Sequence, residues 1–145
     1  IATRHLCSHG QFVFAIAPQH PLATWPGPIP ASELRRHRAI VVADTSQELI
    51  ARTLGVLEGQ NTLRVPDIRA KASAQAAGLG IGHLPRWLAE PEIAAGRLVE
   101  KELADPRPII PLHIAWRSRQ PGKALTWFLA ELEKPEEIAA LAVGL

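Results

Sequence analysis

The sequence of 145 residues contains no methionine, no tyrosine and a single cysteine, Cys7. One cysteine cannot form a disulfide within the chain, and no positively charged leader precedes a long apolar run, so secretion is unsupported. Residues 5–32 carry no Asp, Glu, Lys or Arg, but prolines and polar residues interrupt them, and no window of about 20 residues is apolar enough to cross a bilayer. We therefore expect a cytoplasmic protein with no membrane contact. The start at Ile1 indicates an excerpt or a processed chain.

A strong excess of one charge is also missing. The net charge is +2, and Lys and Arg are spread along the chain without forming a basic stripe, so this segment is not expected to bind a nucleic-acid backbone. Hydrophobic residues make up 47% of the chain, which is enough for one domain to bury a core without disulfides or metal.

Catalytic motifs are absent as well, because the sequence has no G-x-S-x-G, H-E-x-x-H or S-x-x-K pattern. We expect neither enzymatic activity nor a cofactor. His5, Cys7 and His9 alternate, so on a strand they would share one face and could bind Zn²⁺, although no fourth ligand is evident nearby. An exposed terminal segment is the simpler interpretation, and we expect no metal. The GLGIG run, residues 78–82, closes a helix instead of opening one, which argues against a dinucleotide site.

The pattern of apolar residues predicts strands alternating with helices, which is typical of an α/β fold with a mostly parallel sheet. Strands are predicted over residues 11–17, 38–43, 62–65, 81–85, 98–99 and 112–117. Helices are predicted over residues 30–37, 47–54, 68–77, 86–88, 120–134 and 136–143. Trp116 and Trp127 are expected to fill the core.

Local signals predict where several elements end. Asp67 is a plausible N-cap, and the helix after it places Ile68, Ala72, Ala76 and Leu79 on one apolar stripe. Gly78 and Gly80 are expected to stop that helix in left-handed conformations. Proline-rich passages at residues 23–30 and 106–111 are the expected crossings between two lobes.

Two places carry side chains suited to binding. Asp44, Thr45 and Ser46 follow a predicted strand and precede a predicted helix, and such short polar side chains cap helices and bind small anions. His83 follows Gly82 in a short strand, where its imidazole could project into a cleft and change charge near neutral pH. A structural histidine bonded to neighbouring backbone is an equally good interpretation of His83.

The order of these pieces resembles the effector-binding domain of LysR-type transcriptional regulators. The most specific match is the pattern G-L-G-I-x-x-L-P of residues 78–85, followed by a glycine before Leu98 and Val99. The matching passages are FVFAIAPQHPLA (12–23), the PxSELRRHRAIVV-like stretch (30–42), AQAAGLGIGHLP (74–85), AAGRLVE (94–100), LHIAWR (112–117) and GKALTWFLAEL (122–132).

The resemblance implies a type 2 periplasmic-binding-protein-like α/β fold of two lobes, with a small effector held between them. The second lobe would be complete, over residues 23–110. The first lobe would be partial, formed by residues 1–22 and 111–145 with the crossing strands.

The resemblance also implies which residues line the cleft from the second lobe. They are Asp44, Thr45 and Ser46 after its first strand, Pro66, Asp67 and Ile68 at the start of its long helix, and His83 after the glycine motif. Asp67 stands where the family often has a hydroxyl residue. An acid there would repel a carboxylate unless it caps the helix, which leaves room for a neutral or phenolic effector.

The function implied is an effector (co-inducer) sensing module. It would bind a small organic acid, phenolic or other aromatic compound, act within a homo-oligomer, and control transcription. DNA would be contacted only through an N-terminal winged helix-turn-helix outside this segment. A solute-binding receptor of the same fold is the alternative.

Overall fold

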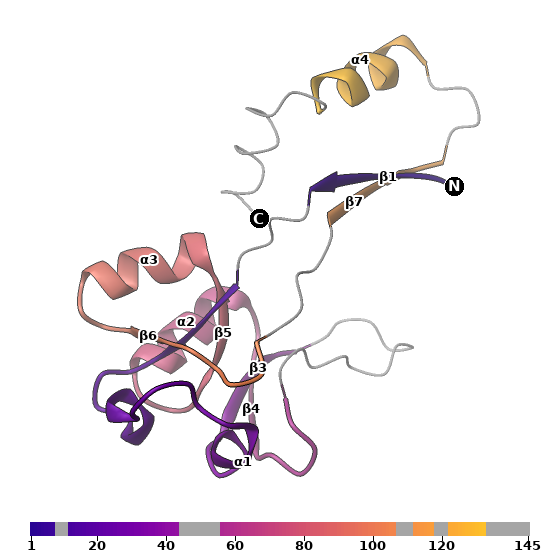
Figure 1. Cartoon of the computed structure of the whole chain (residues 1–145). Coiled ribbons are helices and arrows are strands. Elements are labelled where there is room, and N and C mark those ends of the chain that lie inside the picture. Colours follow the sequence, from indigo (N-terminus) through magenta and orange to yellow (C-terminus); the bar gives the residue numbers. More distant parts are fainter. Residues whose placement is uncertain (8–11, 44–55, 107–111, 118–121, 133–145) are drawn as a thin grey trace. The chain divides into compact units, whose positions relative to one another are not determined.

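The computed structural model describes residues 1–7, 12–43, 56–106, 112–117 and 122–132 (Figure 1). Contacts between residues divide the chain into two compact units. The larger unit is formed by residues 12–107, and the smaller unit by residues 1–11 together with 108–145. Residues 12–22, which the sequence interpretation places with the chain ends, lie in the larger unit. The predicted helix over residues 47–54 lies outside the described residues.

Strand β2 (Phe12–Ile16) has a partner on each side in the larger unit. It pairs antiparallel with β5 (Gly82–Pro85) on one side and antiparallel with β6 (Val99–Lys101) on the other. Every residue of β2 after Phe12 is buried, because elements cover both faces of the strand. The predicted buried strand is confirmed here.

Strands β3 (Ala39–Val42) and β4 (Thr62–Val65) pair in parallel, and a parallel bridge between Ala39 and Ile81 connects β3 to the chain entering β5. The Ile40 N–H donates to the Ile81 carbonyl at 2.9 Å. The larger unit therefore combines one parallel and two antiparallel strand pairs among its described strands, so the expectation of a mostly parallel sheet is wrong. A fully buried strand is a continuous apolar run whether it pairs in parallel or antiparallel, so its sequence does not reveal its direction relative to its neighbours.

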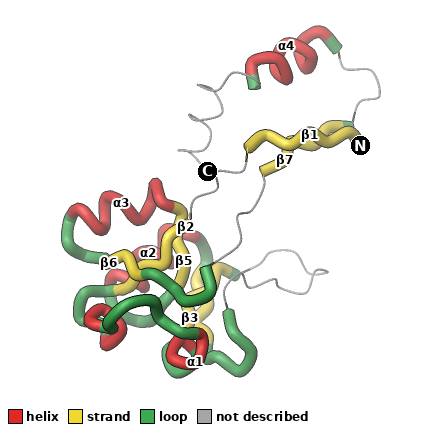
Figure 2. The backbone as a smooth tube through the Cα atoms, viewed as in Figure 1, coloured by secondary structure: helices red, strands yellow, loops and turns green. Residues whose placement is uncertain are grey.

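The two faces of β2 belong to two core clusters, and Figure 2 shows in red the helices of the larger unit that lie around this strand. Helices α2 (Ile68–Ala76) and α3 (Arg86–Ala94) cover one face, and the 3-10 helix η1 (Pro21–Thr24) and helix α1 (Ala31–Leu34) cover the other. The buried residues of the first cluster are Val13, Ala15, Ala72, Leu84, Ala89 and Leu98. Those of the second are Phe14, Ile16, Leu22, Ile29, Leu34 and Ile81.

Asp67 begins α2 as predicted. One oxygen of its carboxylate, Oδ1, accepts the Ala70 N–H at 2.8 Å, which satisfies one of the free donors of the first turn. From the predicted stripe, Ala72 is buried, and Ile68 and Ala76 pack against the core. Leu79 departs from the stripe and is 51% exposed, because α2 ends at Ala76 and the chain then turns.

Of the two glycines expected to be left-handed after α2, only Gly78 is, with φ of 76°. Gly80 is required for a different reason. A Cβ on Gly80 would lie 2.5 Å from the Arg38 carbonyl oxygen and 2.9 Å from Ile40 Cγ1. The missing side chain lets the backbones approach closely, so that the Ile81 N–H donates to the Arg38 carbonyl at 2.9 Å.

A buried glutamine joins α2 to the sheet. Gln75 is fully buried, and its Nε2 donates to the Ala15 carbonyl at 2.6 Å and to the Gly82 carbonyl at 3.1 Å. These carbonyls belong to residues that face each other across β2 and β5. One side chain therefore fixes the helix to two strands.

In the smaller unit, β1 (Ala2–Cys7) pairs antiparallel with β7 (Leu112–Trp116), and helix α4 (Lys123–Glu131) follows. Arg4 Nη1 donates to the Leu129 carbonyl at 3.3 Å. Leu129 and Leu132 are buried, whereas Trp127 is 63% exposed. The expectation that Trp127 fills the core is wrong, because the two leucines take the inward positions.

Candidate functional site

The carboxyl ends of the parallel strands form the first part of the candidate site. Because β3 and β4 run in parallel, their carboxyl ends lie at the same edge, where open α/β sheets bind ligands. Pro66, Asp67 and Ile68 follow β4 there. Asp44, Thr45 and Ser46 follow β3 in the sequence and lie outside the described residues.

The start of α2 presents an acidic group. Pro66 and Asp67 are exposed, whereas Ile68 is half-buried against the core. The Asp67 carboxylate caps the helix through its bond with the Ala70 N–H, so its negative charge already lies at the positive end of the helix dipole. The start of α2 therefore binds a ligand carboxylate less well than it would with a hydroxyl residue at position 67.

A depression of about 310 Å³ in the larger unit forms the second part of the candidate site. It lies where β2 begins and where the chain leaves β6. It is lined by Phe12, Val13, Phe14, His83, Glu100, Lys101, Glu102, Leu103 and Pro106. Among the described residues predicted for the site, His83 lies in this depression, and Pro66, Asp67 and Ile68 do not line it.

His83 occupies a fixed position within this depression. In β5 it pairs with Phe14 of β2, and their rings meet edge to face with centroids 5.3 Å apart. The His83 side chain is 91% covered, with 9% exposed. Phe12 is two residues before Phe14 on the same strand face and is 39% exposed, so it offers an aromatic surface to a ligand.

Two charged residues of the depression, Lys101 and Glu100, have side-chain partners within the larger unit. Lys101 Nζ donates to the Trp25 carbonyl at 2.9 Å and to the Ala23 carbonyl at 3.3 Å. The Glu100 carboxylate accepts bonds from Arg86 at 3.1 and 3.5 Å. Apolar and aromatic residues, His83 and the exposed Glu102 form the rest of the lining. The sequence interpretation missed Phe12, Phe14 and Lys101, because only strand register places them in the same depression as His83.

Within the part of the chain that the structure describes, no group of three His, Cys, Asp or Glu side chains could hold a metal ion. His9, the third member of the alternating set His5, Cys7 and His9, lies outside that part. Among the described helices, none has the length and apolar composition required to cross a lipid bilayer.

Comparison with known proteins identifies the family. The family model described as the LysR substrate binding domain matches residues 1–135. This chain belongs to the LysR substrate-binding domain family. This LysR substrate-binding domain is 36% identical over 129 residues to an uncharacterized HTH-type transcriptional regulator, YeeY, of Escherichia coli K12. The match covers 89% of this chain and 42% of YeeY, so the chain spans less than half the length of that relative.

Solved structures show the same fold. The LysR substrate-binding domain matches the regulatory domain of MetR from N. meningitidis with a TM-score of 0.68 and 19% identity, over 90% of this chain and 61% of that one. It matches the regulatory domain of CcmR from Synechocystis PCC6803, solved in complex with 2-PG, with a TM-score of 0.66 and 19% identity, over 90% and 64% of the two chains. The expected periplasmic-binding-protein-like α/β fold is confirmed.

Proposed function

We propose that this LysR substrate-binding domain is the effector-sensing module of a transcriptional regulator. A small molecule binds in a cleft between two lobes and shifts the equilibrium between two conformations of the regulator. The ligand shifts that equilibrium only by its difference in affinity for the two conformations. DNA is bound by a winged helix-turn-helix in another part of the protein, which acts in the cytoplasm as a homo-oligomer. The observation that carries this proposal is the family match over residues 1–135.

The proposed second lobe, residues 23–110 with β2, supplies one wall of the cleft. Its contacts with the effector are assigned to the strand ends and to the depression that contains His83. The proposed contact residues are Asp44, Thr45, Ser46, Pro66, Asp67, Ile68 and His83, together with Phe12 and Phe14 from the depression. The domain has no catalytic role in this proposal, in keeping with a relative named as a transcriptional regulator.

The effector is proposed to be an organic acid, a phenolic or another aromatic compound, and the residues favour the phenolic or neutral class. Asp67 presents an exposed carboxylate at the start of α2. Lys101, the cation that lines the depression, already donates to two carbonyls. The partly exposed Phe12 suits a planar ring, and the imidazole of His83 suits a hydroxyl or amide group.

A thermal-shift screen tests this proposal with benzoate, benzamide, phenol and aliphatic acids of similar size. A ligand present at about 100 times its dissociation constant stabilises the fold by about 2.7 kcal/mol, which raises the unfolding temperature measurably. Replacement of Thr45 and Ser46 by leucine should abolish that rise, because leucine removes the hydroxyl groups that are proposed to contact the ligand and puts bulky apolar side chains in their place. Ser32→Leu makes a similar change at an exposed position of α1 and should leave the rise intact. An equal rise in the Thr45/Ser46 variant would remove that loop from the site.

Ligand binding should also move the titration of His83. We expect the NMR signals of its imidazole to titrate at a different pH once a ligand from the screen is bound, because a hydrogen bond to the ring favours one protonation state. His113, an exposed residue of β7, serves as the internal reference. If the ligand raises the unfolding temperature but leaves the His83 titration unchanged, His83 does not contact the ligand and its role is structural.

A further inference from the structure

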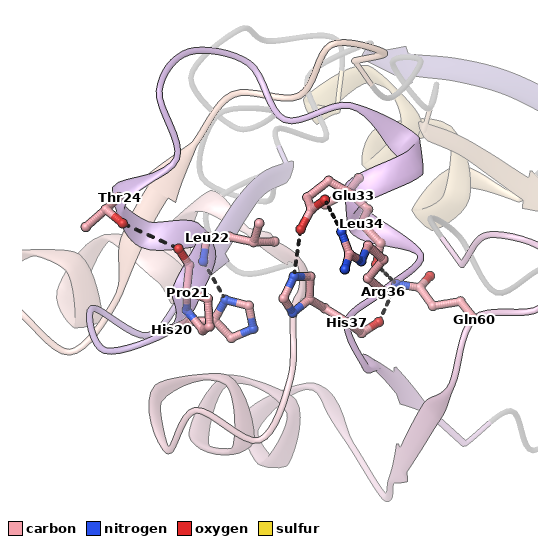
Figure 3. Close-up of polar contacts among 9 residues, drawn as sticks. All are labelled: His20, Pro21, Leu22, Thr24, Glu33, Leu34, Arg36, His37 and Gln60. Atoms are coloured by element: carbon pink, nitrogen blue, oxygen red, sulfur yellow. Dashed lines mark hydrogen bonds and ion pairs between the residues drawn. The ribbon is translucent and has the colours of Figure 1, made fainter.

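Two histidines from separate loops meet beside the second core cluster, as Figure 3 shows. His20 precedes η1, and His37 lies between α1 and β3. Their ring centroids are 4.8 Å apart with an angle of 60° between the planes. The Leu22 N–H donates to His20 Nδ1 at 3.1 Å, so the His20 ring is the N-cap of η1.

This cap requires a neutral His20. A ring nitrogen that accepts a hydrogen bond carries no proton, so the neutral ring must hold its proton on Nε2. Protonation of Nδ1 would replace the cap by two N–H groups facing each other. Burial of the ring, followed by the nearby His37, lowers the pKa of His20. The hydrogen bond of the cap also favours the neutral ring, which agrees with the lowered pKa of His20.

His37 stands beside a carboxylate instead. Its Nε2 is 3.5 Å from Glu33 Oε1, and the other oxygen of that carboxylate lies 3.4 Å from Arg36 Nη1. A proton on His37 is therefore compensated by Glu33, whereas a proton on His20 has no carboxylate among its described contacts. The charged groups that contact the pair or η1 in the described residues include Glu33 and Arg36 from the α1 side and Lys101 from β6 at the far end of η1.

Gln60 holds the backbone that carries His37. Its Nε2 donates to the Leu34 carbonyl at 2.8 Å and to the His37 carbonyl at 2.9 Å, and its Oε1 accepts the Leu57 N–H at 3.0 Å. This buried side chain restricts the movement of the turn after α1. If the His20 ring becomes charged, the segment that can move is therefore the one that starts at His20.

The 3-10 helix η1 connects the histidine pair to the depression that contains His83. At its end, the carbonyls of Ala23 and Trp25 accept bonds from Lys101, which lines the depression. In its middle, Leu22 is 1% exposed and belongs to the core cluster of Phe14, another lining residue. Movement of η1 would therefore change the depression through Lys101 and through the contact of Leu22 with the core cluster of Phe14.

We propose that His20, packed against His37, makes the depression responsive to protons: the neutral cap keeps η1 packed on the core, and protonation of the His20 ring releases η1 and loosens the Lys101 side of the depression. The regulatory meaning, a lower affinity for the effector in acid, rests on the proposed function. The structural coupling between His20, η1 and the depression does not depend on the proposed function, because it is measured without a ligand.

The sign of the effect on stability follows from linkage. The pKa of His20 in the folded protein lies below its value in the unfolded chain, so the unfolded chain binds the proton more readily. The contribution of His20 to stability is complete above about pH 6.5 and is lost as the pH falls through the pKa of the folded state.

The first experiment measures the unfolding temperature from about pH 8 to about pH 5, where histidines titrate. His20→Asn keeps a side chain that can cap η1 but does not titrate. We expect the unfolding temperature of the wild-type chain to fall in acid and that of His20→Asn to fall less. His113→Gln is the matched control and should fall as the wild type does. An equal fall in wild type and His20→Asn would overturn the proposal.

The second experiment follows the amide NMR signals of Phe14 and Glu102 over the same pH range. In the ligand-free wild type, both should shift with the midpoint of the His20 ring. In Lys101→Met, which removes the ammonium group and keeps most of the side-chain length, the Glu102 response should disappear. Amide signals that do not follow His20, or a Glu102 response that persists in Lys101→Met, would overturn the coupling. Because no effector is added, this outcome is independent of the ligand screen.

Discussion

Gly80→Ala should destabilise the larger unit by about 3 kcal/mol or more, the range of severe overpacking. The added Cβ would lie 2.5 Å from the Arg38 carbonyl oxygen, which is a backbone atom and cannot rotate away. Relief of this clash requires separation of β3 from the chain entering β5. That movement breaks the hydrogen bond from the Ile81 N–H to the same carbonyl. Denaturant unfolding followed by circular dichroism measures the loss.

Gly122→Ala is the matched control for this variant. Gly122 also has a negative φ, of −63°, and a Cβ there would meet no atom within 4 Å. Because Gly122 is the N-cap of α4 and alanine is a poorer N-cap than glycine, the control should lower the free energy of unfolding by about 1 kcal/mol or less. Equal unfolding midpoints for the two variants would contradict the close approach at Gly80.

Gln75→Leu should lower the free energy of unfolding by about 1–3 kcal/mol, the cost of leaving a buried polar group without its partner. Leucine fills similar space but donates no hydrogen bond to the Ala15 and Gly82 carbonyls. The loss should be accompanied by faster amide hydrogen exchange where β2 meets β5.

Ser73→Leu makes an apolar change on the exposed face of the same helix and serves as the control for Gln75→Leu. It should leave both the unfolding midpoint and the exchange rates near those of the wild type. If Gln75→Leu were as stable as Ser73→Leu, the bonds from Gln75 to the two strands would contribute nothing measurable to stability.

Local chemistry was enough to predict several features of this fold. Asp67 caps α2 because a short acceptor after a strand satisfies the first free N–H groups of a helix. Gly78 is left-handed because a residue without Cβ tolerates a positive φ after a helix end. Both predictions depend on atoms within a few residues of one another, and a sequence displays such relations directly.

Features that depend on distant partners were not predicted. Gly80 is required by Arg38, about forty residues away in the chain, and a sequence contains no mark of that contact. The antiparallel direction of β2 follows from its partners β5 and β6. Glutamine is a polar residue that is usually exposed on a helix, whereas Gln75 is fully buried in the structure.

The candidate site divides in the same way. His83 was proposed from the glycine pattern before it, and the structure places it in the depression. Phe12 and Lys101 lie near it only because β2 has one particular register with β5 and β6. A shift of β2 by one residue against β5 would move Phe12 to the other face from His83, and a shift of β6 by one residue against β2 would do the same to Lys101.

The pairing of β2 with β6 has a further consequence. These strands are the first and the last of residues 12–107, and Phe14 lies opposite Lys101 in their register. The continuous segment therefore begins and ends at neighbouring positions, as inserted domains do. In evolutionary terms, a stretch of coding sequence with this property can be transferred as one piece, because a recipient protein has to open at only one surface loop to accept it.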